Sequence, residues 1–180
     1  MVSVHEAAEI ISAHCQPLPS RQTSIETALG HVLAETVLAD RDLPPFHRVT
    51  MDGIAVRWSG DDRKFLLTGL QRAGEPGLTL NAPGDAIEIM TGATLPDGAD
   101  TVIRYEDLQL SNGYAVVSDV AEIIKGQNIH YRGQDAKAAS VLLAPPMVLS
   151  PAEIALLAAV GKSQVTVAAW PRIALSTRFQ

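Results

Sequence analysis

The chain has 180 residues, a formal net charge of -6 and a hydrophobic content of 47%. This length and apolar content are typical of a globular protein with one large domain or two small ones. The acidic balance argues against a general nucleic-acid binder, which needs a basic face to release phosphate counterions. No segment supplies the ~20 apolar residues of a membrane span, and the N-terminus lacks signal-peptide grammar. We therefore expect a cytoplasmic protein that binds neither nucleic acid nor membranes.

Two helix-start signals lie near the N-terminus. Ser3–Glu6 and Thr23–Glu26 each match a capping box, in which a hydroxyl and a carboxylate satisfy backbone amides reciprocally. Each signal precedes apolar residues at helical spacing, which predicts two helices, each with one apolar face. The face of the first consists of Ala7, Ile10 and Ile11, and that of the second consists of Ile25, Ala28, Leu29, Val32 and Leu33. A loop is expected over residues 16–22. The single cysteine, Cys15, excludes an internal disulfide and is predicted to be a small core residue without a catalytic role.

The middle of the chain has the texture of a β-rich unit. Short β-like runs are separated by Gly and Pro and cover residues 35–40, 53–58, 64–70, 86–90, 101–110 and 114–118. Ser111-Asn112-Gly113 joins two alternating runs, which predicts a tight hairpin.

A third helix is predicted near the C-terminus. Ser150 can cap it, Pro151 suits its first position, Glu153 completes a capping box and Gly161 is a fitting stop. The body of this helix is almost wholly apolar, so we expect it to pack on its own domain and also on another surface, such as another subunit. Residues 165–177 predict a strand, a Trp-Pro break and a second strand. A buried-type strand so close to the last residue suggests that a further domain would follow.

Four polar clusters fall in predicted loops or at strand ends. They are Asp40-Arg41-Asp42, Asp52-Gly53, Met90-Thr91-Gly92 with the following LPDGAD, and Arg132–Asp135. Each has a local reading as a turn, a cap or an ion pair. For Asp52-Gly53 the choice is between a turn at positive φ and a close approach of the backbone to a ligand. Taken together, carboxylates, hydroxyls and arginines on glycine-marked loops suit an anionic ligand with a divalent cation.

Common catalytic motifs are missing from the sequence. It has no P-loop, no G-x-G-x-x-G, no paired-cysteine zinc pattern and no G-x-S-x-G elbow. Of the five histidines, His5, His14 and His31 are expected on helices, whereas His47 and His130 fall in the candidate loops. Histidine spacing therefore predicts no metal motif.

Four segments in register resemble the N-terminal half of MoeA-type molybdopterin molybdenumtransferases, relatives of the C-terminal domain of gephyrin. The segments are DLPPF with the following MDG-x-AVR, AIEIMTGATLPDGADTVIRYED, GQNIHYRGQD and LSPAEIALLAAVG. The resemblance implies an enzyme of molybdenum cofactor biosynthesis that inserts molybdate into adenylylated molybdopterin with release of AMP, assisted by magnesium. It also implies a homodimer whose site lies between the N-terminal domains of one subunit and the central domain of the other.

The resemblance carries over to particular residues. Asp52, Thr91 and Asp135 match the family's motifs and are the candidate catalytic residues, with Asp52 and Asp135 as candidate metal ligands. Arg132 matches a family arginine and could face a phosphate; Arg48 and His130 are further candidates for binding the substrate.

The sequence also departs from the family pattern. His47-Arg48-Val49-Thr50 stands where the family usually has D-N-S-A, and Ile54 replaces a common tyrosine. His130 takes the place of an arginine, and Gln134 replaces a glutamate. Ala139-Ser140 replaces a common Gly-Asp, and the expected L-S-T-G-D-E-L ends here in Arg178-Phe179-Gln180.

By resemblance we expect an α+β, mostly β fold. Residues 1–46 and 135–170 would form a discontinuous helix-containing dimerisation domain, residues 47–134 an inserted barrel-like domain, and residues 171–180 the start of a missing central domain. We expect a fragment that is inactive alone. Two alternatives remain: a non-catalytic dimerisation or scaffold module, and a β-rich domain that binds a phosphorylated metabolite without molybdenum chemistry.

Overall fold

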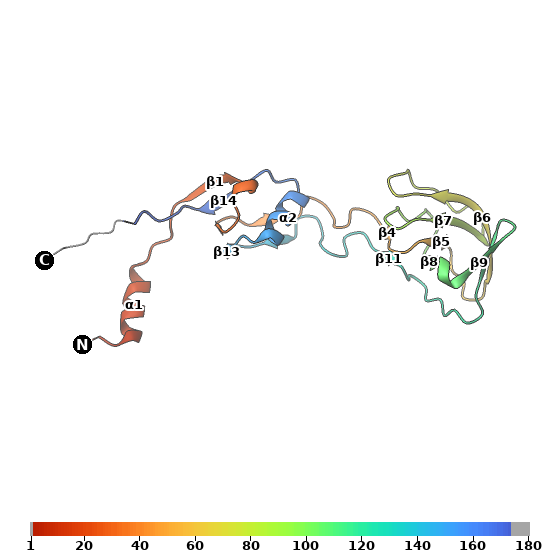
Figure 1. The fold of residues 1–180 in the computed structure, drawn as a ribbon, viewed down its shortest axis with the longest axis horizontal. Helices are drawn as coiled ribbons and strands as arrows, with labels where there is room; N and C mark the ends of the chain where they lie inside the picture. The colour runs from red at the N-terminus through yellow and green to blue at the C-terminus, as the bar shows by residue number, and fades with distance from the viewer. Residues whose placement is uncertain (1, 174–180) are drawn as a thin grey trace. The chain divides into compact units, whose positions relative to one another are not determined.

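The computed structural model describes residues 2–173. It is mostly β-sheet with two α-helices, as the sequence predicts. The chain forms two compact units, which Figure 1 shows in ribbon form. Unit 1 comprises Met1–Leu38 and Val141–Gln180, and unit 2 comprises Ala39–Ser140. The boundaries that the sequence suggested, at residues 46 and 135, lie inside unit 2.

Unit 1 is built on a small sheet with strand order β1-β14-β2-β13 and a separate pair, β12-β3. Its elements are α1 (Val4–His14), β1 (Ser20–Ser24), the 3-10 turn η1 (Ile25–Thr27), β2 (Val32–Leu33), β3 (Val37–Leu38), β12 (Val141–Leu143), β13 (Met147–Val148), α2 (Pro151–Ala159) and β14 (Gln164–Ala168). The buried apolar residues of this unit are Ala28, Leu33, Val37, Leu143, Leu149, Leu157, Val160, Val165 and Val167.

Both terminal helices begin where the sequence predicts. Ser3 and Ser150 each form the complete capping box with the glutamate three residues later. However, none of the residues of α1 is buried, so its apolar face is not covered by the described part of the chain. Cys15 is wrong as a core residue, because it caps the exposed end of α1.

The helix predicted from Thr23–Glu26 is absent. Thr23 belongs to β1, where it pairs with Val165, and only the short turn η1 follows. Gly30 then adopts φ +77°, and Val32 and Leu33 pair with β13 as strand β2. Sheet pairing therefore overrides a local helix-start signal, and His31 lies in the loop before β2 instead of on a helix.

Unit 2 contains a curled, half-barrel sheet of six strands in the order β8-β5-β7-β6-β10-β9 (Figure 1). The elements are β4 (Arg48–Val49), β5 (Gly53–Val56), β6 (Lys64–Gln71), β7 (Asp85–Ile89), β8 (Thr101–Arg104), the 3-10 turn η2 (Tyr105–Asp107), β9 (Leu108–Ser111), β10 (Tyr114–Val117) and β11 (Ile129–His130). The single run expected over residues 101–110 is thus two strands separated by a turn. Only the β6-β7 pair is parallel among the pairs of this sheet.

Strand β5 is buried on both faces. One face packs with Phe65, Ile103 and Val117, and the other packs with Val49 and Ile129 among other residues. The second cluster fixes the short β4-β11 pair against the sheet. Because side chains alternate along a strand, the neighbouring residues Arg48 and His130 point the other way.

The tight hairpin is confirmed. Ser111 and Tyr114 are Cα partners, and Asn112 and Gly113 between them adopt φ +51° and +77°. Positive φ at both central positions is the geometry that suits the right-handed twist of the flanking strands.

We expect Gly113→Ala to lower the free energy of unfolding by about 1 kcal/mol, because a Cβ in the left-handed region approaches the following carbonyl oxygen. Gly77→Ala is the control: its Cβ would meet nothing within 4 Å and its φ is not positive. Urea unfolding of both variants measures the difference. Equal stability of the two variants would contradict the assignment.

Gly53 has a different role from either reading of Asp52-Gly53. Its φ is not positive, and a Cβ built there would overlap the carbonyl oxygen of Ile103 and approach the Cα of Arg104 at 2.7 Å. The missing side chain therefore lets β5 lie close against β8. Neither a turn nor the approach of a ligand explains this glycine.

Candidate functional site

Most of the candidate residues lie on two antiparallel segments of unit 2, residues 39–50 and 128–140, which we call the ribbon. Its ladder includes the β4-β11 pair, the Leu43–Ala136 bridge, and a backbone bond from Ala39 N to Ser140 O of 2.9 Å. The ribbon carries Arg48, His130, Arg132 and Asp135. Asp52 and Thr91 lie next to the ends of β5 and β7.

Asp52 and Thr91 form one hydrogen-bonded pair. The backbone N and the Oγ1 of Thr91 donate to Asp52 Oδ1 at 2.6 and 2.7 Å. These bonds stabilise the charged form and lower the pKa of the Asp52 carboxyl. Both side chains are exposed, so Asp52 is an ionised carboxylate at the surface at neutral pH.

Tyr105 and Glu88 adjoin this pair, and sequence analysis missed both. The backbone N of Tyr105 donates to Asp52 O at 3.1 Å, and its hydroxyl donates to Glu88 Oε2 at 2.9 Å. Burial raises the pKa of Tyr105 to about 12, assisted by Glu88 and by the charge of Asp52. The phenol therefore stays protonated and keeps its donor role. The available signal in the sequence was Glu88 itself, a charged residue within the apolar run that forms the largely buried strand β7.

Arg48, His130 and Asp135 form a chain across the ribbon. Arg48 Nη2 donates to His130 Nδ1 at 3.0 Å, and His130 Nε2 lies 2.8 Å from Asp135 Oδ1. A guanidinium can only donate, so Nδ1 must accept and the proton of the neutral imidazole sits on Nε2, facing the carboxylate. His130 in this tautomer holds an arginine on one side and an aspartate on the other.

Arg132 is engaged in an ion pair with Asp42. Arg132 Nε contacts Asp42 Oδ2 at 2.7 Å, and the amide of Ala138 donates to Asp42 Oδ1 at 3.0 Å. The bond from the Ala138 amide lowers the pKa of the Asp42 carboxyl most, and the bond from Arg132 lowers it further. His47 accepts a bond from the backbone N of Arg132 at Nδ1, at 3.1 Å. Asp42 of the cluster Asp40–Asp42 thus links the two segments of the ribbon. It is also the ion-pair partner of Arg132, the arginine that is predicted to face a phosphate.

An open pocket of about 290 Å³ joins the two groups of candidates. Its lining consists of Arg48, Val49, Thr50, Thr91 and Gly92. Arg48 connects this pocket to the His130–Asp135 pair, and Thr91 connects it to Asp52. The pocket presents a guanidinium and a hydroxyl, which are groups that bind oxyanions.

The described residues 2–173 contain no cluster of three or more His, Cys, Asp or Glu side chains that could hold a metal ion alone. Thr91 donates to Oδ1 of Asp52, and His130 contacts Oδ1 of Asp135, so these contacts leave the Oδ2 atom of each carboxylate to other ligands. Magnesium in proteins is commonly held by one or two carboxylates together with substrate phosphates and water. These carboxylates therefore fit magnesium only if a substrate supplies further oxygens.

We expect Thr91→Val to raise the pKa of the Asp52 carboxyl, because the variant loses the hydroxyl bond. A carboxyl with a lowered folded-state pKa adds stability above its unfolded pKa of about 3.9, and loses it as pH falls through the folded value. The stability difference between the two proteins should therefore be full at neutral pH and shrink at pH values below about 3.9. Urea unfolding across pH measures it; Thr79→Val, at another exposed threonine, should show a pH-independent difference.

Comparison with known proteins places the chain in a family. A family model described as the MoeA N-terminal region (domain I and II) matches residues 2–161. The chain belongs to this family. A molybdopterin molybdenumtransferase from Synechocystis sp. is 35% identical over 176 residues, which covers 96% of this chain and 45% of that protein. One from Staphylococcus aureus (strain Mu50) is 31% identical over 182 residues, covering 97% of this chain and 43% of that protein.

Solved structures agree with this assignment. The crystal structure of the molybdopterin biosynthesis moeA protein from Pyrococcus horikoshii OT3 matches with a TM-score of 0.84 and 29% identity, over 93% of this chain and 46% of that one. A second structure of the moeA protein from this organism matches at a TM-score of 0.71 and 30% identity, over 93% and 44%. The chain spans less than half the length of the relatives it matches. Among the described residues, no helix is long and apolar enough to cross a bilayer.

Proposed function

We propose that the chain is the N-terminal portion of a molybdenum insertase, which transfers molybdate into adenylylated molybdopterin and releases AMP. The observation that carries the proposal is the Asp52–Thr91 pair beside the pocket lined by Arg48, in a member of the MoeA N-terminal family. Relatives matched over almost this whole chain are molybdopterin molybdenumtransferases.

In this proposal the residues of the chain bind and orient two anions. Arg48 and the Thr91 hydroxyl supply donors to oxyanion or phosphate oxygens at the pocket. Asp52, kept ionised by Thr91, and Asp135 each offer a carboxylate oxygen to magnesium, which when bound neutralises phosphate charge. Arg132 is braced by Asp42 and would meet a phosphate at the ribbon, with His130 fixing Arg48 and Asp135 on either side.

The 180-residue chain is inactive alone in this proposal, because it holds only part of the site. The relatives are more than twice as long as the segment they share with it. A homodimer completes the site with the remaining portion of the longer protein, and the enzyme works in the cytoplasm with other proteins of molybdenum cofactor synthesis. The alternative, a non-catalytic dimerisation or scaffold module, is favoured only by the exposed apolar faces of unit 1.

The deciding experiment begins by sequencing the native transcript past the codon for Thr177. A continuing reading frame allows the longer protein to be purified and supplied with molybdate, magnesium and adenylylated molybdopterin. We expect molybdate-stimulated AMP release from the longer protein and none from the 180-residue chain. Release by the short chain would overturn its inactivity; no release by a folded longer protein would overturn the enzymatic proposal.

A further inference from the structure

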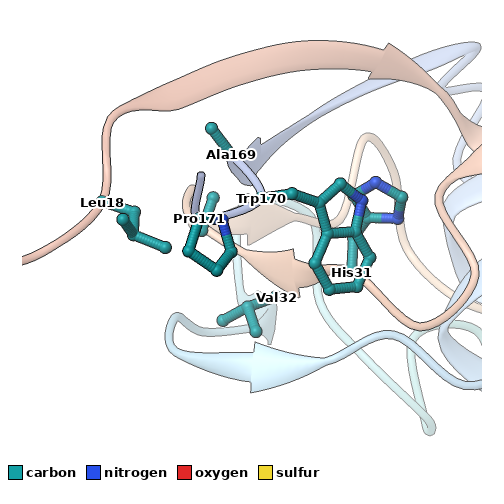
Figure 2. Close-up of a pocket in the computed structure, with 7 residues that line it drawn as sticks. Leu18, His31, Val32, Ala169, Trp170 and Pro171 are labelled. Atoms are coloured by element: carbon teal, nitrogen blue, oxygen red, sulfur yellow. The ribbon is translucent and has the colours of Figure 1, made fainter. Parts of the chain in front are cut away.

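Unit 1 contains a partly enclosed cavity of about 170 Å³ at one end of the β1-β14 ladder. Its wall consists of His31 together with apolar or aromatic residues, namely Leu18, Val32, Ala168, Ala169, Trp170 and Pro171. Figure 2 shows the indole ring of Trp170 against the imidazole ring of His31, with Leu18, Val32 and Pro171 around the rest of the cavity. The described residues that form this wall include no Asp, Glu, Lys or Arg. The chemistry proposed for unit 2 makes no use of this cavity.

His31 is held in place by its backbone and by one nitrogen of its ring. Its backbone N donates to Ala28 O at 3.0 Å, and its backbone O accepts from Leu149 N at 2.9 Å. Nη2 of Arg21 lies 3.1 Å from His31 Nε2. Because a guanidinium can only donate, Nε2 accepts and the proton of the neutral imidazole is on Nδ1. The Nδ1–H group of His31 is therefore a donor that remains for another group.

This donor is buried and has no hydrogen-bond partner. His31 is 9% exposed, and between residues 2 and 173 no other buried side-chain nitrogen or oxygen lacks a partner. Such an orphaned donor is destabilising, and buried polar groups of native proteins are nearly always paired. A water molecule needs several polar neighbours, whereas the side chains of this wall offer it only the N–H groups of His31 and Trp170. A ligand with an acceptor atom on an apolar body fits the wall better.

The chemistry of the wall defines the class of ligand. The cavity is close in volume to an apolar protein cavity of about 150 Å³ that binds benzene, so a single six-membered ring fits. The rings of Trp170 and His31 favour a planar ligand that stacks. A charged ligand would lose its hydration without meeting a countercharge in the wall, so the ligand is neutral. His31 Nδ1–H requires an acceptor on the ring, such as a ring nitrogen.

Trp170 can give a ligand access to the donor. Its ring centroid is 4.9 Å from that of His31, and the two rings are inclined by 58°. Trp170 follows Ala169, whose backbone N donates to Pro19 O at 2.8 Å, and it is 64% exposed. The indole can therefore turn aside with little loss of buried area, and its face then packs on the incoming ring.

We propose that this cavity binds an uncharged six-membered heteroaromatic ring, which accepts a hydrogen bond from His31 Nδ1 and packs against Trp170. The site belongs to unit 1 alone, and none of the residues of its wall lines the unit 2 pocket. It does not depend on the proposed insertase function. It is therefore tested without molybdate or molybdopterin.

The test compares pyridine with benzene in titrations of the 180-residue chain. The two probes have nearly the same shape, and pyridine, which is uncharged at neutral pH, adds one ring nitrogen. NMR follows the His31 Nδ1–H and Trp170 indole resonances; Trp170→Phe assigns the latter, because Trp58 is the only other tryptophan. We expect saturable binding of pyridine with a Kd of about 1 mM or lower, and a shift of both resonances. Benzene should shift the indole resonance without forming the bond to Nδ1.

His31→Phe separates the hydrogen bond from the shape of the cavity, because it keeps a ring and removes the donor. We expect this variant to bind pyridine about 10-fold more weakly and to bind benzene as the unaltered chain does. His14→Phe, at an exposed histidine of α1, is the matched control and should change neither affinity. The melting temperature of His31→Phe should not fall, since the variant loses an unpaired buried donor.

Two results would overturn the proposal. One is the absence of saturable pyridine binding by the unaltered chain. The other is an equal change in the affinities for pyridine and benzene in a folded His31→Phe variant. If that variant does not fold, the unaltered chain decides: a saturating pyridine titration that leaves the His31 Nδ1–H resonance unmoved also contradicts the proposal. Each result holds whether or not the longer protein proves to be an insertase.

Discussion

Gly53→Ala is expected to lower the free energy of unfolding by about 3 kcal/mol or more, at the upper end of the cost of overpacking a core. The added methyl group would overlap the backbone of β8 at Ile103 and Arg104, and a backbone cannot rotate away as a side chain can. Relief requires β5 to move away from β8, and β5 is buried on both faces. We therefore expect a melting temperature well below that of the unaltered protein.

The matched control is Gly69→Ala, in strand β6 of the same sheet. A Cβ there meets only Leu78 Cδ1 at 3.4 Å, and φ is not positive. We expect its free energy of unfolding to stay within about 1 kcal/mol of the unaltered chain, since alanine loses less backbone entropy than glycine on folding. Urea denaturation of both variants decides the matter. A Gly53→Ala chain as stable as the control would mean that β5 and β8 are not packed this closely.

Asp52→Asn in the longer protein is expected to reduce molybdate-stimulated AMP release at least about 100-fold, in the range seen when one charge-stabilising group is removed from an active site. Asparagine retains an oxygen that can accept the two bonds from Thr91, so the variant removes the charge and keeps the shape. Because Asp52 is exposed and asparagine keeps both bonds, the change in stability should be too small to account for the loss of activity. The loss would therefore report chemistry and not folding.

Asp61→Asn serves as the control for charge. Asp61 is another exposed aspartate of unit 2, outside the pocket and the ribbon, and its replacement should leave AMP release unchanged. If Asp52→Asn retains more than half of the activity, Asp52 has no part in binding the metal or the anions. A variant that loses activity together with its melting transition would be replaced by Asp52→Ser before any conclusion is drawn.

Signals that act within a few residues were sufficient to predict several elements. The capping boxes at Ser3 and Ser150 and the Asn112-Gly113 turn depend on bonds between neighbours in sequence. The capping box at Thr23 failed because its residues also pair with a strand about 140 positions later, and no local signal reports that pairing. Exposure of α1 was unpredictable for the same reason, since an apolar face does not say which surface covers it.

In the candidate site, too, the sequence could suggest individual residues but not the contacts between distant segments. The glycine-marked loops and the family resemblance made Asp52, Thr91 and Asp135 candidates, and the structure adds the residues that they contact. Arg48 and His130 are 82 positions apart and meet only because β4 pairs with β11. The Asp42–Arg132 pair spans 90 positions in the same way. Such contacts follow from strand register, which residue types alone do not specify.

The ribbon holds the first and last residues of unit 2 next to each other. Its first and last residues, Ala39 and Ser140, are bonded to each other, with a second bond from Ala139 N to Ala39 O at 2.9 Å. Because the first and last residues of unit 2 lie side by side, the unit can be excised or exchanged for the same unit of a relative. A short turn can then rejoin the two segments of unit 1. The pocket, Asp52 and Asp135 would remain in the excised unit, whereas both α-helices belong to unit 1. The anion binding that we propose for unit 2 can therefore be measured separately from any property of unit 1.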